Sequence, residues 1–185
     1  MAETLRARIK SCKYVVVFVG MDEVVVRPAR EDDAETLYRL GLAAIEHSAA
    51  GHYDQRQREA WAGRRTAEGH ARMIRDTTTL VAEVGGEPAG FASVALRPVG
   101  GLRAGEVDQL FVDPRHGGRG VARALLDAVA EAAASAGLTE LVTHASWRAV
   151  PVFEALGYRR VEVETVELDG VALTRALMRR TISAP

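Results

Sequence analysis

Three glycines and three arginines around a single turn form the part of this chain best suited to binding chemistry. The glycines are Gly117, Gly118 and Gly120, and the arginines are Arg115, Arg119 and Arg123. The apolar run Leu110–Val112 precedes the turn and apolar residues at helical spacing follow from Val121, which predicts a strand, a tight turn and a helix. Free N–H groups in the first helical turn and nearby arginines would then bind a pyrophosphate.

Two familiar nucleotide-binding patterns do not fit this turn. A P-loop requires Lys-Ser or Lys-Thr after its last glycine, and here Val121 follows Gly120. A dinucleotide fingerprint requires a third glycine, but Arg123 stands at that position, and the turn does not follow the first strand of the chain. The alternative is a purely structural turn with solvated arginines, because such glycine patterns also occur by chance.

Two segments carry a resemblance to a known family. Leu110–Ala122 resembles the acetyl-CoA-binding motif of the GNAT superfamily of N-acetyltransferases, [QR]-x-x-G-x-[GA]. Gly120 and Ala122 match that motif, whereas Gly117 replaces its Gln or Arg. Ala145–Tyr158 is similar to the family's second segment, N-x-x-A-x-x-F-Y-x-x-x-G-F. Two motifs in the family's order are far more specific than either alone.

The resemblance covers about residues 24–180, and it implies a fold and a cofactor site. The fold would be mixed α/β, with a central, splayed sheet of about six to seven strands, about four flanking helices, and acetyl-CoA in the splay. Gly117 keeps its backbone N–H, so phosphate binding is expected to be weakened rather than lost. The implied cofactor-binding residues are Leu110, Phe111, Val112, Gly117, Gly118, Arg119, Gly120, Val121, Ala122, Arg123, Ser146 and Phe153.

Acetyl transfer to an amine needs a group that takes a proton, because an alkylammonium is not a nucleophile. The family often places this base on the strand before the phosphate turn, where this chain has Glu106 and Asp108, two residues apart and so on one face. Either acid could serve, or both could be solvated carboxylates. His144, at the end of the next expected strand, is a candidate proton relay or simply a packed histidine.

The second motif departs from the family at the position of its usual tyrosine. Phe153 occupies that position and cannot donate a proton, so either the thiolate leaves unassisted and is protonated by water, or another group serves as the acid. Ser146 stands where the family often has Asn, which bonds the pantetheine arm; the alternative role of this serine is to cap a helix.

The acceptor side is implied to lie between the first two helices and the closing hairpin. Glu46 could supply charge there, and Tyr53 and Trp61 could form a cation–π wall for an amine. The alternative is a pair of amphipathic helices with core aromatics. His47 and His52 lack further ligands at metal-binding spacing, so no metal is expected.

Apolar periodicity and turn residues predict the elements that must position these groups. Strands are expected at 23–27, 78–84, 89–96, 104–112, 138–144, 158–168 and 171–178. Helices are expected at 32–49, 55–74 with interruptions near Gly63 and Gly69, 118–136 and 146–156. This order is that of the GNAT fold. The run at 14–20 is either a further strand or part of a disordered extension.

Composition fits one globular domain. The 185 residues are 48% hydrophobic and 26% charged, and the net charge of −1 gives no electrostatic reason to expect nucleic acid or an anionic membrane as a partner. We expect a single N-acetyltransferase domain at residues 23–181 after an N-terminal extension at residues 1–22, with Met21 as an alternative start. The single cysteine, Cys12, excludes an internal disulfide and fits a cytoplasmic location.

Together these features predict an acetyl-CoA-dependent N-acetyltransferase that moves an acetyl group directly to a primary amine of a small molecule or a peptide. A homodimer is compatible with the exposed sheet edges of such folds. The alternative is a non-catalytic CoA-binding sensor or interaction module, which the departures at Gly117 and Phe153 would fit.

Overall fold

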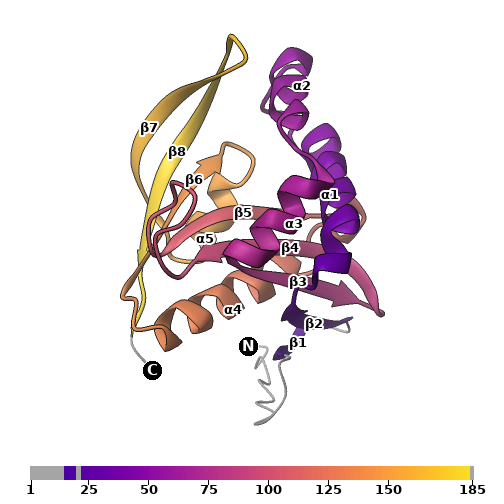
Figure 1. The fold of residues 1–185 in the computed structure, drawn as a ribbon, viewed down its shortest axis with the longest axis vertical. Coiled ribbons are helices and arrows are strands. Elements are labelled where there is room, and N and C mark those ends of the chain that lie inside the picture. Colours follow the sequence, from indigo (N-terminus) through magenta and orange to yellow (C-terminus); the bar gives the residue numbers. More distant parts are fainter. Residues whose placement is uncertain (1–14, 20–21, 184–185) are drawn as a thin grey trace.

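One mixed β-sheet runs through the computed structural model, which describes residues 15–19 and 22–183 (Figure 1). Its strands follow the order β1-β2-β3-β4-β5-β6-β8-β7. The strands are β1 (Val15–Val19), β2 (Asp22–Pro28), β3 (Thr78–Val84), β4 (Glu87–Ala95), β5 (Glu106–Val112), β6 (Glu140–Ser146), β7 (Arg159–Leu168) and β8 (Val171–Thr181). The helices are α1 (Ala34–Ala43), α2 (Gln55–Gly63), α3 (Ala67–Asp76), α4 (Val121–Ser135) and α5 (Val150–Ala155), with short turns η1 (Glu31–Asp33), η2 (Ala44–Ser48) and η3 (Pro114–His116).

The sheet opens between β5 and β6. Among the described strands these two run parallel, whereas the other neighbouring pairs are antiparallel. Only two register pairs join them, Glu106 with Val142 and Val107 with Thr143. Beyond these pairs β5 continues along β4 while β6 continues along β8. The two halves of the sheet therefore separate toward the carboxyl end of β5, as the predicted splay requires.

Helices cover both faces of the sheet (Figure 1). The apolar side of α4 packs on one face, where Val121, Leu125 and Val129 are buried in one cluster with sheet residues such as Val94 and Val107. On the opposite face, α1 and α3 bury a second cluster; its members include Leu37, Leu40, Ile45, Met73, Phe91 and Phe111. Burial of this apolar area is the main force that holds the layers together.

Gly90 lets α4 start close to the sheet. A Cβ atom at this β4 position would lie 2.8 Å from the carbonyl oxygen of Phe111 and 2.8 Å from Cγ1 of Val121. Neither distance is possible for a real side chain, so only glycine allows the first turn of α4 to pack here. The position of that first turn matters because it forms part of the cavity described below.

The predicted fold class is confirmed, with a splayed mixed sheet and helices on both faces. Eight strands are described rather than six or seven, because β1 pairs with β2 from Val15 opposite Val26 to Val19 opposite Asp22. Residues 1–14 and 20–21, and with them the predictions on Cys12 and Met21, lie outside the described residues. No helix in the described ranges is long and apolar enough to cross a membrane.

Two local predictions are wrong. Gly69 does not interrupt the second helical stretch but lies within α3, near the N-cap Thr66, whose hydroxyl accepts a hydrogen bond from the Gly69 N–H at 3.0 Å. Ser146 does not cap a helix; it ends β6, where it pairs with Arg175 of β8, and α5 begins only after Ala149. Cross-strand pairing, which the local sequence does not reveal, decides the second case.

Candidate active site

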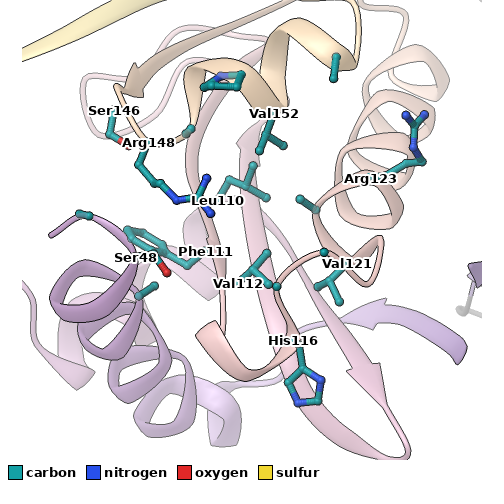
Figure 2. A pocket seen from close by; sticks show the side chains of 18 of the residues that line it. Ser48, Leu110, Phe111, Val112, His116, Val121, Arg123, Ser146, Arg148 and Val152 are labelled. Atoms are coloured by element: carbon teal, nitrogen blue, oxygen red, sulfur yellow. The ribbon is translucent and has the colours of Figure 1, made fainter. Parts of the chain in front are cut away.

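A cavity of about 430 Å³ opens at the splay between β5 and β6 (Figure 2). Its walls come from the end of β5, the turn into α4, the segment from β6 into α5, and the residues around η2. Predicted cofactor residues that line it are Leu110, Phe111, Val112, Gly117, Gly118, Gly120, Val121, Ala122, Arg123 and Ser146. The structure therefore brings together ten of the twelve predicted cofactor-binding residues.

The first turn of α4 offers free N–H groups to this cavity. Gly120, its N-cap, has φ of 76°, a left-handed conformation that favours glycine, and no side chain caps the helix. The first backbone bond of the helix is donated by Ala124 to the carbonyl of Gly120, so the N–H groups of residues 121–123 are not used within α4. With the helix dipole behind them, these donors fit a diphosphate.

The arginines around this turn have different roles. Arg115 forms an ion pair with Asp113 at 2.7 Å, which holds the pKa of that carboxyl below its usual range. Arg119 does not line the cavity; its Nη1 lies 3.3 Å from Nδ1 of His116. Arg148, which was not predicted from the sequence, also lines the cavity, and its side chain reaches from the segment after β6 toward Leu110 in Figure 2. A lone arginine after a strand carried no signal that would have identified it.

Phe153 lies in the core rather than on the cavity wall. It is 2% exposed and contacts Tyr158 edge-on with ring centroids 4.9 Å apart, while its neighbour Val152 lines the cavity. Tyr158 is equally buried, and burial raises its pKa above the ordinary value. Neither ring can protonate a thiolate from this position: Phe153 has no donor, and Tyr158 points into the apolar core.

A β-bulge places Asp108 where the splay begins, directly after Val107, the last residue of β5 that pairs with β6. The register between β4 and β5 shifts between Ser93, opposite Gln109, and Val94, opposite Val107, so Asp108 is the extra residue of β5. The Asp108 side chain reaches water, but protein atoms surround much of it, and this partial desolvation raises its pKa. A hydrogen bond from Gln109 and the charge of Arg65 act against that rise, while Glu106 adds to it.

Glu106 on β5 and His144 on β6 lie close to each other, and Glu106 is two residues before the bulge. Nε2 of His144 is 3.8 Å from Oε1 of Glu106, and its Nδ1 is 2.8 Å from Oε2 of Glu164 on β7. Glu164 also accepts a hydrogen bond from Nε of Arg175 at 3.0 Å. Desolvation opposes ionisation of Glu164, but the hydrogen bonds from His144 and Arg175 outweigh it and lower its pKa. Polar side chains therefore follow one another from Glu106 to the β7–β8 hairpin. Glu164 and Arg175 on this hairpin were not predicted from the sequence.

The three residues predicted for the acceptor site do not form one wall. Trp61 lines the cavity and lies 6.1 Å from the Phe111 ring centroid. Glu46 is exposed and faces a separate hollow between η2 and α2. Tyr53 is 5% exposed, and its hydroxyl donates to the carbonyl of Thr174 at 2.8 Å and accepts from the N–H of Trp147 at 3.0 Å. Tyr53 thus ties three segments together, with its hydroxyl fully engaged.

We expect Tyr53→Phe to destabilise the protein by about 1–2 kcal/mol, because it removes two hydrogen bonds and leaves the N–H of Trp147 without a partner. Chemical denaturation would measure the loss. Tyr38→Phe on α1 is the matched control, since its ring contacts His70 and no hydrogen bond of its hydroxyl is described. Equal stability of the Tyr53→Phe variant and the wild type would show that the two hydrogen bonds of the hydroxyl do not stabilise the fold.

Comparison with known proteins agrees with this geometry. The family model for the acetyltransferase (GNAT) domain matches residues 49–179. The chain belongs to the GNAT acetyltransferase family. It is 30% identical over 159 residues to the uncharacterised N-acetyltransferase YafP of Escherichia coli (strain K12), a match that covers 86% of this chain and 97% of YafP. The protein is therefore an N-acetyltransferase, which is an acyltransferase.

Solved GNAT structures share the fold of this family member. A GCN5-related N-acetyltransferase from Rhodopseudomonas palustris superposes with a TM-score of 0.76 at 31% identity, over 85% of this chain and 94% of that one. The acetyltransferase yncA of Salmonella typhimurium, solved with its cofactor acetyl-CoA, superposes with a TM-score of 0.59 at 24% identity, over 85% and 93% of the two chains. Within the described residues of this GNAT protein, no three His, Cys, Asp or Glu side chains gather as a metal site would require.

Proposed function

We propose that this GNAT enzyme transfers the acetyl group of acetyl-CoA directly to a primary amine of a small molecule or a peptide, with Asp108 as the base. The observation that carries the proposal is the position of Asp108. It is a bulged carboxylate with a raised pKa, on the same strand as the cavity-lining residues Leu110 and Phe111 and two residues before the first of them.

The residues of the splay fit the shape and charge of acetyl-CoA. The N–H groups of residues 121–123 would bind its diphosphate, and the apolar side chains of Leu110 and Val112 would contact the pantetheine arm. Ser146 lines the same cavity and offers a hydroxyl to the arm. Bound acetyl-CoA supplies the acetyl group as a thioester, whose C–S bond breaks as the amide forms.

Asp108 fits the role of base better than Glu106. Glu106 already accepts a hydrogen bond from the backbone N–H of Arg103 at 3.1 Å, so one of its carboxylate oxygens is engaged with the protein. The raised pKa of Asp108 brings it closer to neutral pH, where a base is most effective. Asp108 therefore takes the proton of the acceptor amine.

Direct transfer is supported by the lack of a thiol among the described residues that line the cavity at the splay. The single cysteine, Cys12, is far in sequence from both motifs. The proton that completes the departing thiol comes from water, which is sufficient because a free thiol has a pKa of about 8.5.

A screen of amine acceptors with a colour reagent for free thiol tests this proposal. We expect thiol release that depends on both acetyl-CoA and an acceptor amine, with the acetylated amine as the second product by mass spectrometry. Saturable acetyl-CoA binding without acceptor-dependent thiol release would instead favour a non-catalytic CoA sensor.

A further inference from the structure

A second cavity, of about 340 Å³, adjoins the splay on the side of α2 and α3. Trp61 lines both cavities, and Gln109, which lines the second, directly precedes Leu110, which lines the first. Leu168, at the end of β7, closes the second cavity from the hairpin. This hollow is therefore in position to hold the part of the acceptor that does not react.

Two side-chain contacts join the β7–β8 hairpin to α2 beside this hollow. Both extend beyond the sheet in the same direction (Figure 1). Nε2 of Gln57 donates to the carbonyl of Ala172 at 2.8 Å, and Nη2 of Arg64 lies 3.0 Å from Oδ1 of Asp169. The hollow is thus held between two joined elements.

Arg65 brings a largely buried cation to the wall of this hollow. Its Nη1 donates to Oε1 of Gln109 at 2.8 Å, and its Nε is buried with no hydrogen-bond partner among the described residues. The guanidinium carbon lies 4.5 Å from the ring centroid of Phe111 and 6.0 Å from that of Trp61. No carboxylate in the described part of the chain forms an ion pair with it. Burial lowers its pKa to about 10, although the negative charge of nearby Asp108 acts in the opposite direction.

Gln109 separates this cation from the carboxylate of Asp108. Its side chain accepts the hydrogen bond of Arg65 and also bonds to Asp108. A positive and a negative group therefore lie on either side of a single amide. A buried arginine without a direct ion pair is best satisfied by a carboxylate, which can accept two parallel hydrogen bonds from its planar head.

We propose that the acceptor is a small amino-carboxylate, in which the carboxylate binds Arg65 while the nearby primary amine gives its proton to Asp108. This inference rests on the proposed function and narrows it. A peptide N-terminus has no carboxylate close to its amine unless an acidic side chain follows, so the inference favours a free small molecule over a peptide.

Matched acceptors test the inference with the wild-type enzyme. The panel is the standard L-amino acids, each with its carboxamide and its decarboxylated amine, at a fixed acetyl-CoA concentration. We expect at least one amino acid to be acetylated with a kcat/KM about 100-fold above that of its own carboxamide and amine, because each of these leaves Arg65 without an anion. Faster transfer to carboxamides, amines or peptides would overturn the inference and leave the proposed function intact.

Variants of Arg65 separate its charge from its packing. For the preferred amino acid, Arg65→Gln should lower kcat/KM about 100-fold but change kcat/KM for its decarboxylated amine less than threefold, and Arg65→Lys should recover part of the loss. Arg72→Gln on the exposed side of α3, where Arg72 pairs with Glu68 at 2.7 Å, is the matched control. Equal losses for both acceptors would mean that Arg65 only supports the fold, and acetyl-CoA binding without transfer to any acceptor would overturn the proposed function as well.

Discussion

Asp108→Asn should lower kcat about 10³-fold while acetyl-CoA binds as in the wild type, because the amide cannot accept the proton of the acceptor. The wild-type rate should fall as the pH is lowered through the raised pKa of Asp108, since the protonated carboxyl is no longer a base. The variant should lack this acidic limb. Steady-state rates across a pH series would measure both effects.

Glu106→Gln is the control that separates the two acids. Glu106 raises the pKa of Asp108 by charge repulsion, so its removal should shift the acidic limb to lower pH and change the maximal rate by less than about tenfold. The opposite result, in which Glu106→Gln abolishes turnover and Asp108→Asn preserves it, would move the base to Glu106.

The melting temperature of Asp108→Asn shows whether its lost activity comes from the missing base or from damage to the fold. Because the folded-state pKa of Asp108 is raised, this group contributes stability below its unfolded pKa and loses that contribution as the pH rises through the folded value. Asparagine does not ionise, so at pH 7 the variant should melt at the same temperature as the wild type or higher. A lower melting temperature would mean that the lost activity reflects damage to the fold.

The second large effect concerns the phosphate turn. Ala122→Glu should weaken acetyl-CoA binding at least about 100-fold, because a carboxylate would then occupy the anion site at the first turn of α4. The same carboxylate interacts favourably with the helix dipole, so the free protein should lose no stability. Thermal melting with and without acetyl-CoA separates the two quantities, since a ligand at a hundred times its Kd adds about 2.7 kcal/mol to the wild type.

Ser135→Glu is the matched control for Ala122→Glu. It adds the same charge to the same helix, at the exposed last residue of α4, away from the cavity. Acetyl-CoA should stabilise this variant as it does the wild type. If both glutamate variants bound acetyl-CoA normally, the first turn of α4 would not be the anion site.

The strand, turn and helix of the proposed phosphate site could be predicted because their signals are local. Glycines at 117, 118 and 120 and the apolar spacing of α4 act within one short segment, and the structure places them as expected. The boundaries of β3 followed for the same reason, since Gly85 and Gly86 mark its end.

The acceptor side could not be predicted because its features depend on contacts between distant segments. The bulge at Asp108 arises from the register of β5 against β4, and the pairing of Arg65 with Gln109 joins residues 44 positions apart. Tyr53 was predicted to contact substrate because an aromatic residue near charged ones has the same local pattern in a cleft or in a core. Its hydrogen bonds with Thr174 on β8 and with Trp147 after β6 hold Tyr53 in the core.

Titration calorimetry with acetyl-CoA and with S-acetylpantetheine, which carries the same thioester arm but lacks the diphosphate and the 3′-phosphoadenosine attached to it, tests the central claim most directly. If the amides at the start of α4 hold the diphosphate, acetyl-CoA should bind saturably at one site per chain and S-acetylpantetheine at least about 100-fold more weakly. Equal affinity for the two ligands, or no saturable heat with acetyl-CoA, would contradict the account.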